Sequence, residues 1–222
     1  MRKAWEMNKK KRLLRTSANI LRVLPAMLLL AVVGGEKRRV IADDSLFWHK
    51  RNGYDAKYGP FPHPIVLMVI YPEFRNLVIH RIRYWGGGSA GPITRCCHYF
   101  VGWLIGVLFP PMKTLYLATK DIGRNLFIQH GFSTIVSARK IGDNCWINQQ
   151  VTIGFGNSKV PPTLGNGVRV CAGAKVIGEL SVGDNAIIGA NAVVTKDVGS
   201  RDVVGGVPAK RIKSNDDHLL FP

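Results

Sequence analysis

Cut every six residues, the stretch Leu164–Gly199 reads LGNGVR VCAGAK VIGELS VGDNAI IGANAV VTKDVG. Every unit begins with an aliphatic residue, and its fifth position is small or apolar, as at Val168 and Ala174. An α-helix would bring apolar residues back every three to four positions, and a simple hairpin would alternate them. A period of six is instead typical of a parallel β-helix, whose short strands stack coil on coil.

The same period reaches back to residue 122 through the units IGRNLF, IQHGFS, TIVSAR, IGDNCW and INQQVT, with Lys140 as one extra residue. Gly or Asn at the third and fourth positions, as at Gly167 and Asn185, supplies the positive φ of a sharp turn. The sequence therefore predicts a β-helix over residues 115–200 and a C-terminal extension over 201–222. Eleven of the twelve first positions are aliphatic: Ile122, Ile128, Thr134, Ile141, Ile147, Ile153, Leu164, Val170, Val176, Val182, Ile188 and Val194.

The charge of the 222 residues is concentrated in the N-terminal half. Lys and Arg number 31 against 14 Asp and Glu, a net charge of +17. Residues 1–114 hold 19 basic and 6 acidic residues (net +13), and residues 115–222 hold 12 and 8 (net +4). Such a block suits anionic lipid, a phosphate-bearing substrate or simply a solvated surface. We expect no nucleic-acid partner, because the block lacks interleaved aromatic residues and any known recognition module.

Residues 1–114 are predicted to form a helical, partly apolar region. Pro72 and Glu73 mark a helix start, and Gly86–Pro92 is a flexible break. The apolar runs Ile20–Val33 and His98–Pro111 are too short to span a bilayer, which takes about 20 residues. We expect an interfacial helix on the inner face of the cytoplasmic membrane, the alternative being a helix packed internally.

The cysteines Cys96, Cys97, Cys145 and Cys171 show neither metal-ligand spacing nor a disulfide pattern. This usage indicates a reducing, cytoplasmic setting. Cys145, at a fifth position, is predicted to fill the core.

His130 is the candidate for chemistry. It occupies the third position of its unit, which points away from the packed axis, and it is the only His between residues 99 and 217. A zinc site takes several such ligands, so we expect no metal. The loop FGNSKVPPT makes the spacing from Ile153 to Leu164 eleven residues, and loops ejected from solenoids tend to be functional. A lone outward His is also, quite often, only a surface residue.

Five stretches, IGRNLFIQHG, INQQVTIG, VCAGAKVIG, VGDNAIIGANAVVTKDV and GGVPAKRI, together resemble the serine acetyltransferase-like branch of the hexapeptide acyltransferases over residues 115–213. LFIQHGFSTI and NCWINQQVTIG look most like members encoded in bacterial capsule and exopolysaccharide clusters. The resemblance implies a left-handed β-helix assembled as a homotrimer, with acetyl-CoA in the cleft between the β-helices of neighbouring chains.

The resemblance also implies roles for individual residues. His130 would be the general base that deprotonates the acceptor hydroxyl, a contribution of about 10²–10⁴-fold. Gln149 and Gly131 would lie on the acceptor side. The residues expected to bind acetyl-CoA are Phe155, Ala172, Ala190, Lys196, Val207, Pro208 and Lys210.

Two positions depart from the serine acetyltransferase pattern. Leu115 stands where the Asp that orients the His would align, and Pro161 where a second active-site His would align. Asp121 and Gln129 are other candidates for orienting His130. These losses weaken a serine acceptor, so we expect transfer of acetyl to a sugar hydroxyl in capsule or exopolysaccharide synthesis. The alternatives are serine O-acetylation for cysteine synthesis and a catalytically silent scaffold.

Overall fold

The computed structural model describes residues 20–52, 63–84 and 91–214 of the chain. It divides into two compact units, Met1–Pro111 and Met112–Pro222. We call them the helical unit and the solenoid, and each is described by itself.

The helical unit contains five described helices. Proline opens two of them, where its missing N–H costs nothing. The predicted helix start at Pro72 is confirmed, whereas the helix that begins at Gly35 was missed because its charged residues hide a buried face formed by Val40, Ile41 and Trp48. The predicted break at Gly86–Pro92 lies mostly outside the described residues. The helices are α2 (Ile20–Val32), α3 (Gly35–Arg51), α4 (His63–Ile70), α5 (Pro72–Tyr84) and α6 (Pro92–Leu108).

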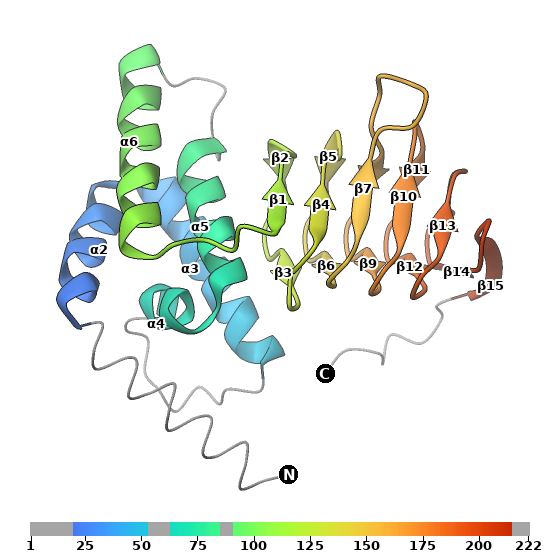
Figure 1. The fold of residues 1–222 in the computed structure, drawn as a ribbon, viewed down its shortest axis with the longest axis horizontal. Coiled ribbons are helices and arrows are strands. Elements are labelled where there is room, and N and C mark those ends of the chain that lie inside the picture. The colour runs from blue at the N-terminus through green and yellow to red at the C-terminus, as the bar shows by residue number, and fades with distance from the viewer. Residues whose placement is uncertain (1–19, 53–62, 85–90, 215–222) are drawn as a thin grey trace, which may run out of the picture. The chain divides into compact units, whose positions relative to one another are not determined.

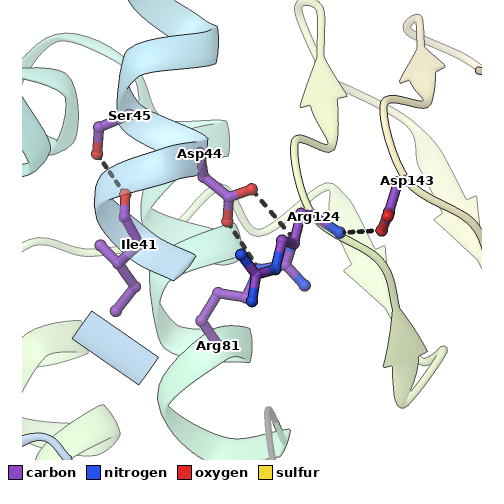
Figure 2. A network of polar contacts seen from close by, with 6 residues as sticks. All are labelled: Ile41, Asp44, Ser45, Arg81, Arg124 and Asp143. Carbon is purple, nitrogen blue, oxygen red and sulfur yellow. Dashed lines mark hydrogen bonds and ion pairs between the residues drawn. The ribbon is translucent and has the colours of Figure 1, made fainter. Parts of the chain in front are cut away.

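The core of the helical unit combines aromatic packing with buried charge. The rings of Trp48 and Phe74 meet edge to face at 5.1 Å between centroids. Beside them Arg81 Nε donates to Asp44 Oδ2 at 2.7 Å and Arg81 Nη2 donates to Asp44 Oδ1 at 3.2 Å (Figure 2). The two side chains are 0% and 1% exposed, so this bidentate ion pair is fully desolvated. Among the helices of the described residues, none is both long and apolar enough to cross a membrane.

The solenoid is a three-sided prism of parallel sheets, which confirms the predicted parallel β-helix (Figure 1). As far as β13, successive strands occupy sheets A, B and C in turn, and only the last pair, β14 with β15, is antiparallel. Sheet A holds β1 (Leu115–Leu117), β4 (Thr134–Val136), β7 (Thr152–Gly154), β10 (Lys175–Ile177) and β13 (Val193–Val194). Sheet B holds β2 (Asp121–Ile122), β5 (Lys140–Ile141), β8 (Thr163–Leu164) and β11 (Ser181–Val182). Sheet C holds β3 (Phe127–Ile128), β6 (Trp146–Ile147), β9 (Arg169–Val170), β12 (Ile187–Ile188), β14 (Asp202–Gly205) and β15 (Lys210–Ser214).

The first residues of the six-residue units fill the prism. In sheet C, for example, Ile128, Ile147, Val170 and Ile188 stack in register and are all buried. Removing one such side chain from water is worth about 1.5–3 kcal/mol, so the repeated column supplies much of the fold's stability. β14 pairs in parallel with β12, so the coils continue past residue 200, where we predicted that they end.

One detail of the predicted register is wrong. Val136, not Thr134, pairs with Ile153 and so takes the place of the first residue of the unit, although Thr134 is buried as well. The irregularity therefore lies in the corner between β3 and β4, not at Lys140. Ile135 follows Ile128 by seven residues, whereas its register partner Thr152 follows Ile147 by five, so this corner is two residues longer than the next. It is the corner that carries His130.

Candidate active site

His130 lies in the extended corner that leads from β3 into β4. Its backbone has φ +66°, and Gly131 behind it has φ +52°. The carbonyl of His130 accepts a hydrogen bond from the Phe132 N–H at 2.7 Å, which closes the turn. Farther along, the buried Thr134 hydroxyl donates to the Phe132 carbonyl at 3.2 Å. This corner leaves His130 exposed to solvent, as its third position in the unit predicts.

A corner between sheets C and A recurs in the coils, and it is two residues longer at His130 than in the next coil. In the register of sheet C, Ile128, Ile147, Val170, Ile188 and Val204 are equivalent. The residues two positions later therefore lie along one edge of the prism. This His130 edge consists of His130, Gln149, Ala172, Ala190 and Gly206. The proposed base, the acceptor-side Gln and the two small residues expected beside the cofactor thus share one edge, where the small residues leave the backbone open to approach.

Two amide oxygens next to His130 lack a partner. In the coil that follows, Asn148 Oδ1 and Gln149 Oε1 are buried without a hydrogen bond among the described residues. A buried acceptor costs about 1–3 kcal/mol when it stays unsatisfied, so such atoms usually await a donor. A ligand with ammonium or hydroxyl donors would satisfy both. Asn148 was not among the predicted site residues, although the polar run Asn148–Gln150, in the coil after His130, could have indicated it.

Other predicted cofactor residues lie elsewhere. Ile177 pairs with Gly154, and Val176 pairs with Val194. The positions that follow therefore stack as Phe155, Gly178 and Lys196, which we call the loop edge. Sheet A separates this edge from the His130 edge, because β7 runs from one to the other. One chain alone does not bring Phe155 and Lys196 to His130.

The loop edge carries the ejected segment Phe155–Pro162, which projects between β7 and β8 (Figure 1). Ser158 anchors it, since its hydroxyl donates to Glu179 Oε2 at 2.9 Å and accepts from the Val160 N–H at 3.1 Å. Phe155 is 52% exposed at the mouth of the loop. The loop is therefore anchored at Ser158 and exposes the aromatic ring of Phe155.

The remaining predicted residues lie at the far end of the His130 edge. Val207 and Pro208 follow Gly206 in the turn between β14 and β15, and both are exposed. Lys210 opens β15 opposite Gly205 and is exposed as well. These three residues continue the His130 edge beyond Ala190.

The structure tests the candidates for orienting His130. Leu115 is 4% exposed and lies opposite Thr134 in sheet A, so it provides only apolar packing. Asp121 belongs to sheet B, where its carboxylate lies 3.7 Å from Lys140 Nζ. Asp121 was therefore a wrong candidate, because it faces outward from a different side of the prism. Gln129, whose N–H donates to the Ile147 carbonyl, is adjacent to His130 at the start of the corner.

An exposed apolar patch adjoins the His130 corner and was not predicted. Tyr116 and Ile135 are register partners on the outer face of sheet A, 63% and 46% exposed, and Phe132 in the corner is 43% exposed. Later coils place the polar residues Thr152 and Lys175 at the equivalent positions. The patch is thus confined to the two coils that flank His130.

The solenoid cysteine at position 145 has the structural role expected from its place in the repeat. Cys145 is fully buried, and its Sγ donates to the Gly165 carbonyl at 3.2 Å. Burial raises the pKa of the Cys145 thiol to about 12, which keeps it protonated and unreactive. Among the described residues there is no cluster of His, Cys, Asp and Glu that could hold a metal ion.

Comparison with known proteins identifies relatives of this chain. A family model described as bacterial transferase hexapeptide (six repeats) matches residues 161–196. A serine acetyltransferase from Helicobacter pylori is 47% identical over 153 residues, which cover 66% of this chain and 84% of that protein. A serine acetyltransferase from Synechococcus elongatus is 38% identical over 151 residues, 66% of this chain but only 59% of the relative's length.

A solved structure shows the same fold. The serine acetyltransferase from Brucella abortus in complex with coenzyme A superposes with a TM-score of 0.59 at 26% identity. The match covers 86% of this chain and 73% of the Brucella chain. The similarity thus extends over both the helices and the coils.

Proposed function

Since the chain belongs to the serine acetyltransferase family of hexapeptide-repeat transferases, we propose that it transfers the acetyl group of acetyl-CoA to the hydroxyl of L-serine. One observation carries the proposal: the coil after the exposed His130 carries, on the same edge, two buried amide oxygens that have no hydrogen-bond partner among the described residues. A base and a set of acceptors for a small polar substrate thus lie on adjacent coils.

The sugar acceptor that we expected from the capsule-like stretches of sequence is wrong. The relatives at 47% and 38% identity are serine acetyltransferases, and so is the Brucella protein. Leu115 and Pro161 remove polar groups, but Asn148 and Gln149 supply others next to the base. The departures from the family pattern therefore do not require a different acceptor.

The chemistry follows from an imidazole at an exposed corner. His130 takes the proton of the serine hydroxyl as that oxygen attacks the thioester carbonyl of acetyl-CoA. The tetrahedral intermediate then collapses, the carbon–sulfur bond breaks, and the departing thiolate of coenzyme A takes the proton from the imidazolium. Asn148 Oδ1 and Gln149 Oε1 accept hydrogen bonds from the serine ammonium and hold the hydroxyl at the base.

The donor site is proposed to need two chains. In a homotrimer, the His130 edge of one chain faces the loop edge of its neighbour. Acetyl-CoA lies between them, against Ala172 and Ala190 of one chain and against Phe155 and Lys196 of the other, and the basic side chains of Lys196 and Lys210 face its phosphates. The exposed patch of Tyr116, Phe132 and Ile135 supports this assembly, because a neighbouring copy would remove it from water.

The first test measures thiol release from acetyl-CoA with L-serine. We expect serine-dependent release by the wild type and a loss of about 10²–10⁴-fold in His130→Ala, with coenzyme A binding retained. Lys140→Ala, an exposed position on sheet B, is the matched control and should keep full activity. A folded wild-type protein that binds coenzyme A yet releases no thiol with L-serine would overturn the proposal, and a silent scaffold would bind none.

Mixed assemblies test the shared site. His130→Ala chains and Phe155→Ala chains would each be impaired alone. Co-expressed, they would form some clefts with an intact His130 edge and an intact loop edge, and part of the activity would return. Absence of any recovery in verified mixed trimers would show that each chain holds a complete site.

A further inference from the structure

Helix α6 exposes an apolar face. Ile93, Phe100, Trp103 and Val107 are 79%, 58%, 56% and 58% exposed. Their spacing of seven, three and four residues places them on one side of the helix, with the rings of Phe100 and Trp103 stacked at 5.9 Å. The buried residues Gly102 and Ile105 occupy another side. The helix thus packs through one face and offers a second apolar face to solvent.

Helix α2 repeats this arrangement. Leu24, Leu28 and Val32 recur every four residues and are 65%, 62% and 72% exposed, while Ala26 and Leu30 are buried. The two helices lie side by side within the helical unit (Figure 1). We call these seven exposed residues the α2–α6 apolar surface. Exposed apolar residues gathered on neighbouring helices, unlike scattered ones, mark an interaction site.

The charges of this surface are of one sign. Helices α2 and α6 contain Arg22 and Arg95, both exposed, and no Asp or Glu. Directly before α2, residues 1–19 carry 7 Lys and Arg against 1 Glu, a net charge of +6. Helix α3 differs, since it mixes acidic and basic residues along GEKRRVIADDSLFWHKR. A second copy of the chain would bring the same positive charge and be repelled, whereas an anionic partner is attracted.

We propose that the α2–α6 apolar surface docks the protein on a membrane rich in anionic lipid. The helices lie in the interface, with their exposed aliphatic and aromatic residues at the acyl boundary, where Trp is favoured. Arg22 and Arg95 meet the phosphate groups, at about 1 kcal/mol for each basic residue near the surface. With 13 and 17 residues, α2 and α6 suit an interfacial position better than a spanning one.

Vesicle flotation of the full chain tests the proposal. We expect binding to vesicles of phosphatidylcholine and phosphatidylglycerol, little binding to phosphatidylcholine alone, and release at high salt. Trp103→Glu and Leu28→Glu should each lower the partitioning by about tenfold or more, because burial of one large apolar side chain is worth at least that factor. Leu46→Glu is the matched control, since Leu46 is 57% exposed but lies on α3, and it should bind as the wild type does.

Three results would overturn the proposal: no flotation of the wild type, an equal loss in Leu46→Glu, or a lower mass by light scattering in Trp103→Glu without wild-type flotation. The last would make the surface an interface between copies. Serine-dependent thiol release, measured on the same variants in solution, should stay at the wild-type level. The docking surface and the proposed activity therefore stand or fall separately.

Discussion

The helical unit and the solenoid bury different kinds of side chain. Among the described residues of the solenoid, the buried polar ones are Thr119 and Thr134. The rest of its core is aliphatic, apart from Phe127 and Cys145. The charged residues buried among those described, Lys37, Asp44, Glu73 and Arg81, all lie in the helical unit. The solenoid repeats one apolar contact from coil to coil, whereas the helical unit depends on individual pairings such as Asp44 with Arg81, 37 residues apart.

The two units should differ in how much stability a single substitution costs. A column residue in the solenoid has equivalent neighbours above and below, so the loss of one contact leaves the others in place. A buried ion pair has no such substitute, because each partner leaves an uncompensated charge when the other is removed. Stability should therefore respond to single substitutions more steeply in the helical unit.

Arg81→Met is expected to show the largest effect. It removes the guanidinium that pairs with the buried Asp44 carboxylate, at a cost of about 3–5 kcal/mol in the free energy of unfolding of the helical unit. Chemical denaturation followed by far-UV circular dichroism, which reports mainly on helices, measures the loss. The double variant Asp44→Leu with Arg81→Met should recover most of it, because both charges are gone. If the double variant is no more stable than Arg81→Met, the ion pair is not what makes this position sensitive.

Gly142→Ala tests the close approach of neighbouring coils. A Cβ at Gly142 would lie 2.6 Å from the carbonyl carbon and oxygen of Gly165, backbone atoms that cannot turn away. We expect a loss of about 1–3 kcal/mol in solenoid stability, the usual cost of overpacking. Gly154→Ala is the control, since a Cβ there would meet nothing within 4 Å. Equal thermal transitions for the two variants would mean that the coils can move apart without cost.

The same contrast explains what the sequence could predict. The six-residue period identified the sheets, the core and the outward position of His130, because each coil repeats a local rule. The longer corner at residues 129–133 interrupts that rule, and Thr134, the one polar first position, was its only sign. The distribution of Phe155 and Lys196 on a second edge depends on how coils stack. The pairing of Asp44 with Arg81 depends on tertiary packing, which no period encodes.

Thr134→Val tests a single buried polar contact of the solenoid. The variant keeps the buried shape but removes the hydroxyl that donates to the Phe132 carbonyl, at about 1 kcal/mol. Thr119→Val is a matched change, since the Thr119 hydroxyl accepts from the Ala138 N–H at 2.7 Å and Thr119 lies at another corner, between β1 and β2. Both variants should lose similar stability, but only Thr134→Val should lower kcat with serine, by a few-fold. An equal fall in kcat would show that the corner does not depend on Thr134.

His98→Gln tests the contact between His98 and Lys37 in the helical unit, and its expected effect is the smallest. His98 Nδ1 lies 3.1 Å from the ammonium of Lys37, whose Nζ also donates to the Ile82 carbonyl at 2.7 Å. Burial, and then the positive charge of Lys37, lower the pKa of His98 in the folded chain. Below the ordinary histidine range the unfolded chain binds a proton that the folded chain does not, so the stability of the helical unit should fall as the pH drops.

The Gln variant cannot titrate, so its stability should vary less with pH between about 7.5 and 5.5, the range of an ordinary histidine. The two proteins should have similar denaturation midpoints at the upper end and separate progressively toward the lower end, with the variant the more stable there. Parallel curves would assign the pH dependence to other groups and leave Lys37 and His98 as a polar contact without a role in proton linkage. A pair of this kind has no counterpart in the coils, whose core holds no titrating group in the neutral range among the described residues. The dependence of stability on pH therefore distinguishes the helical unit, which contains this titrating pair, from the apolar core of the solenoid.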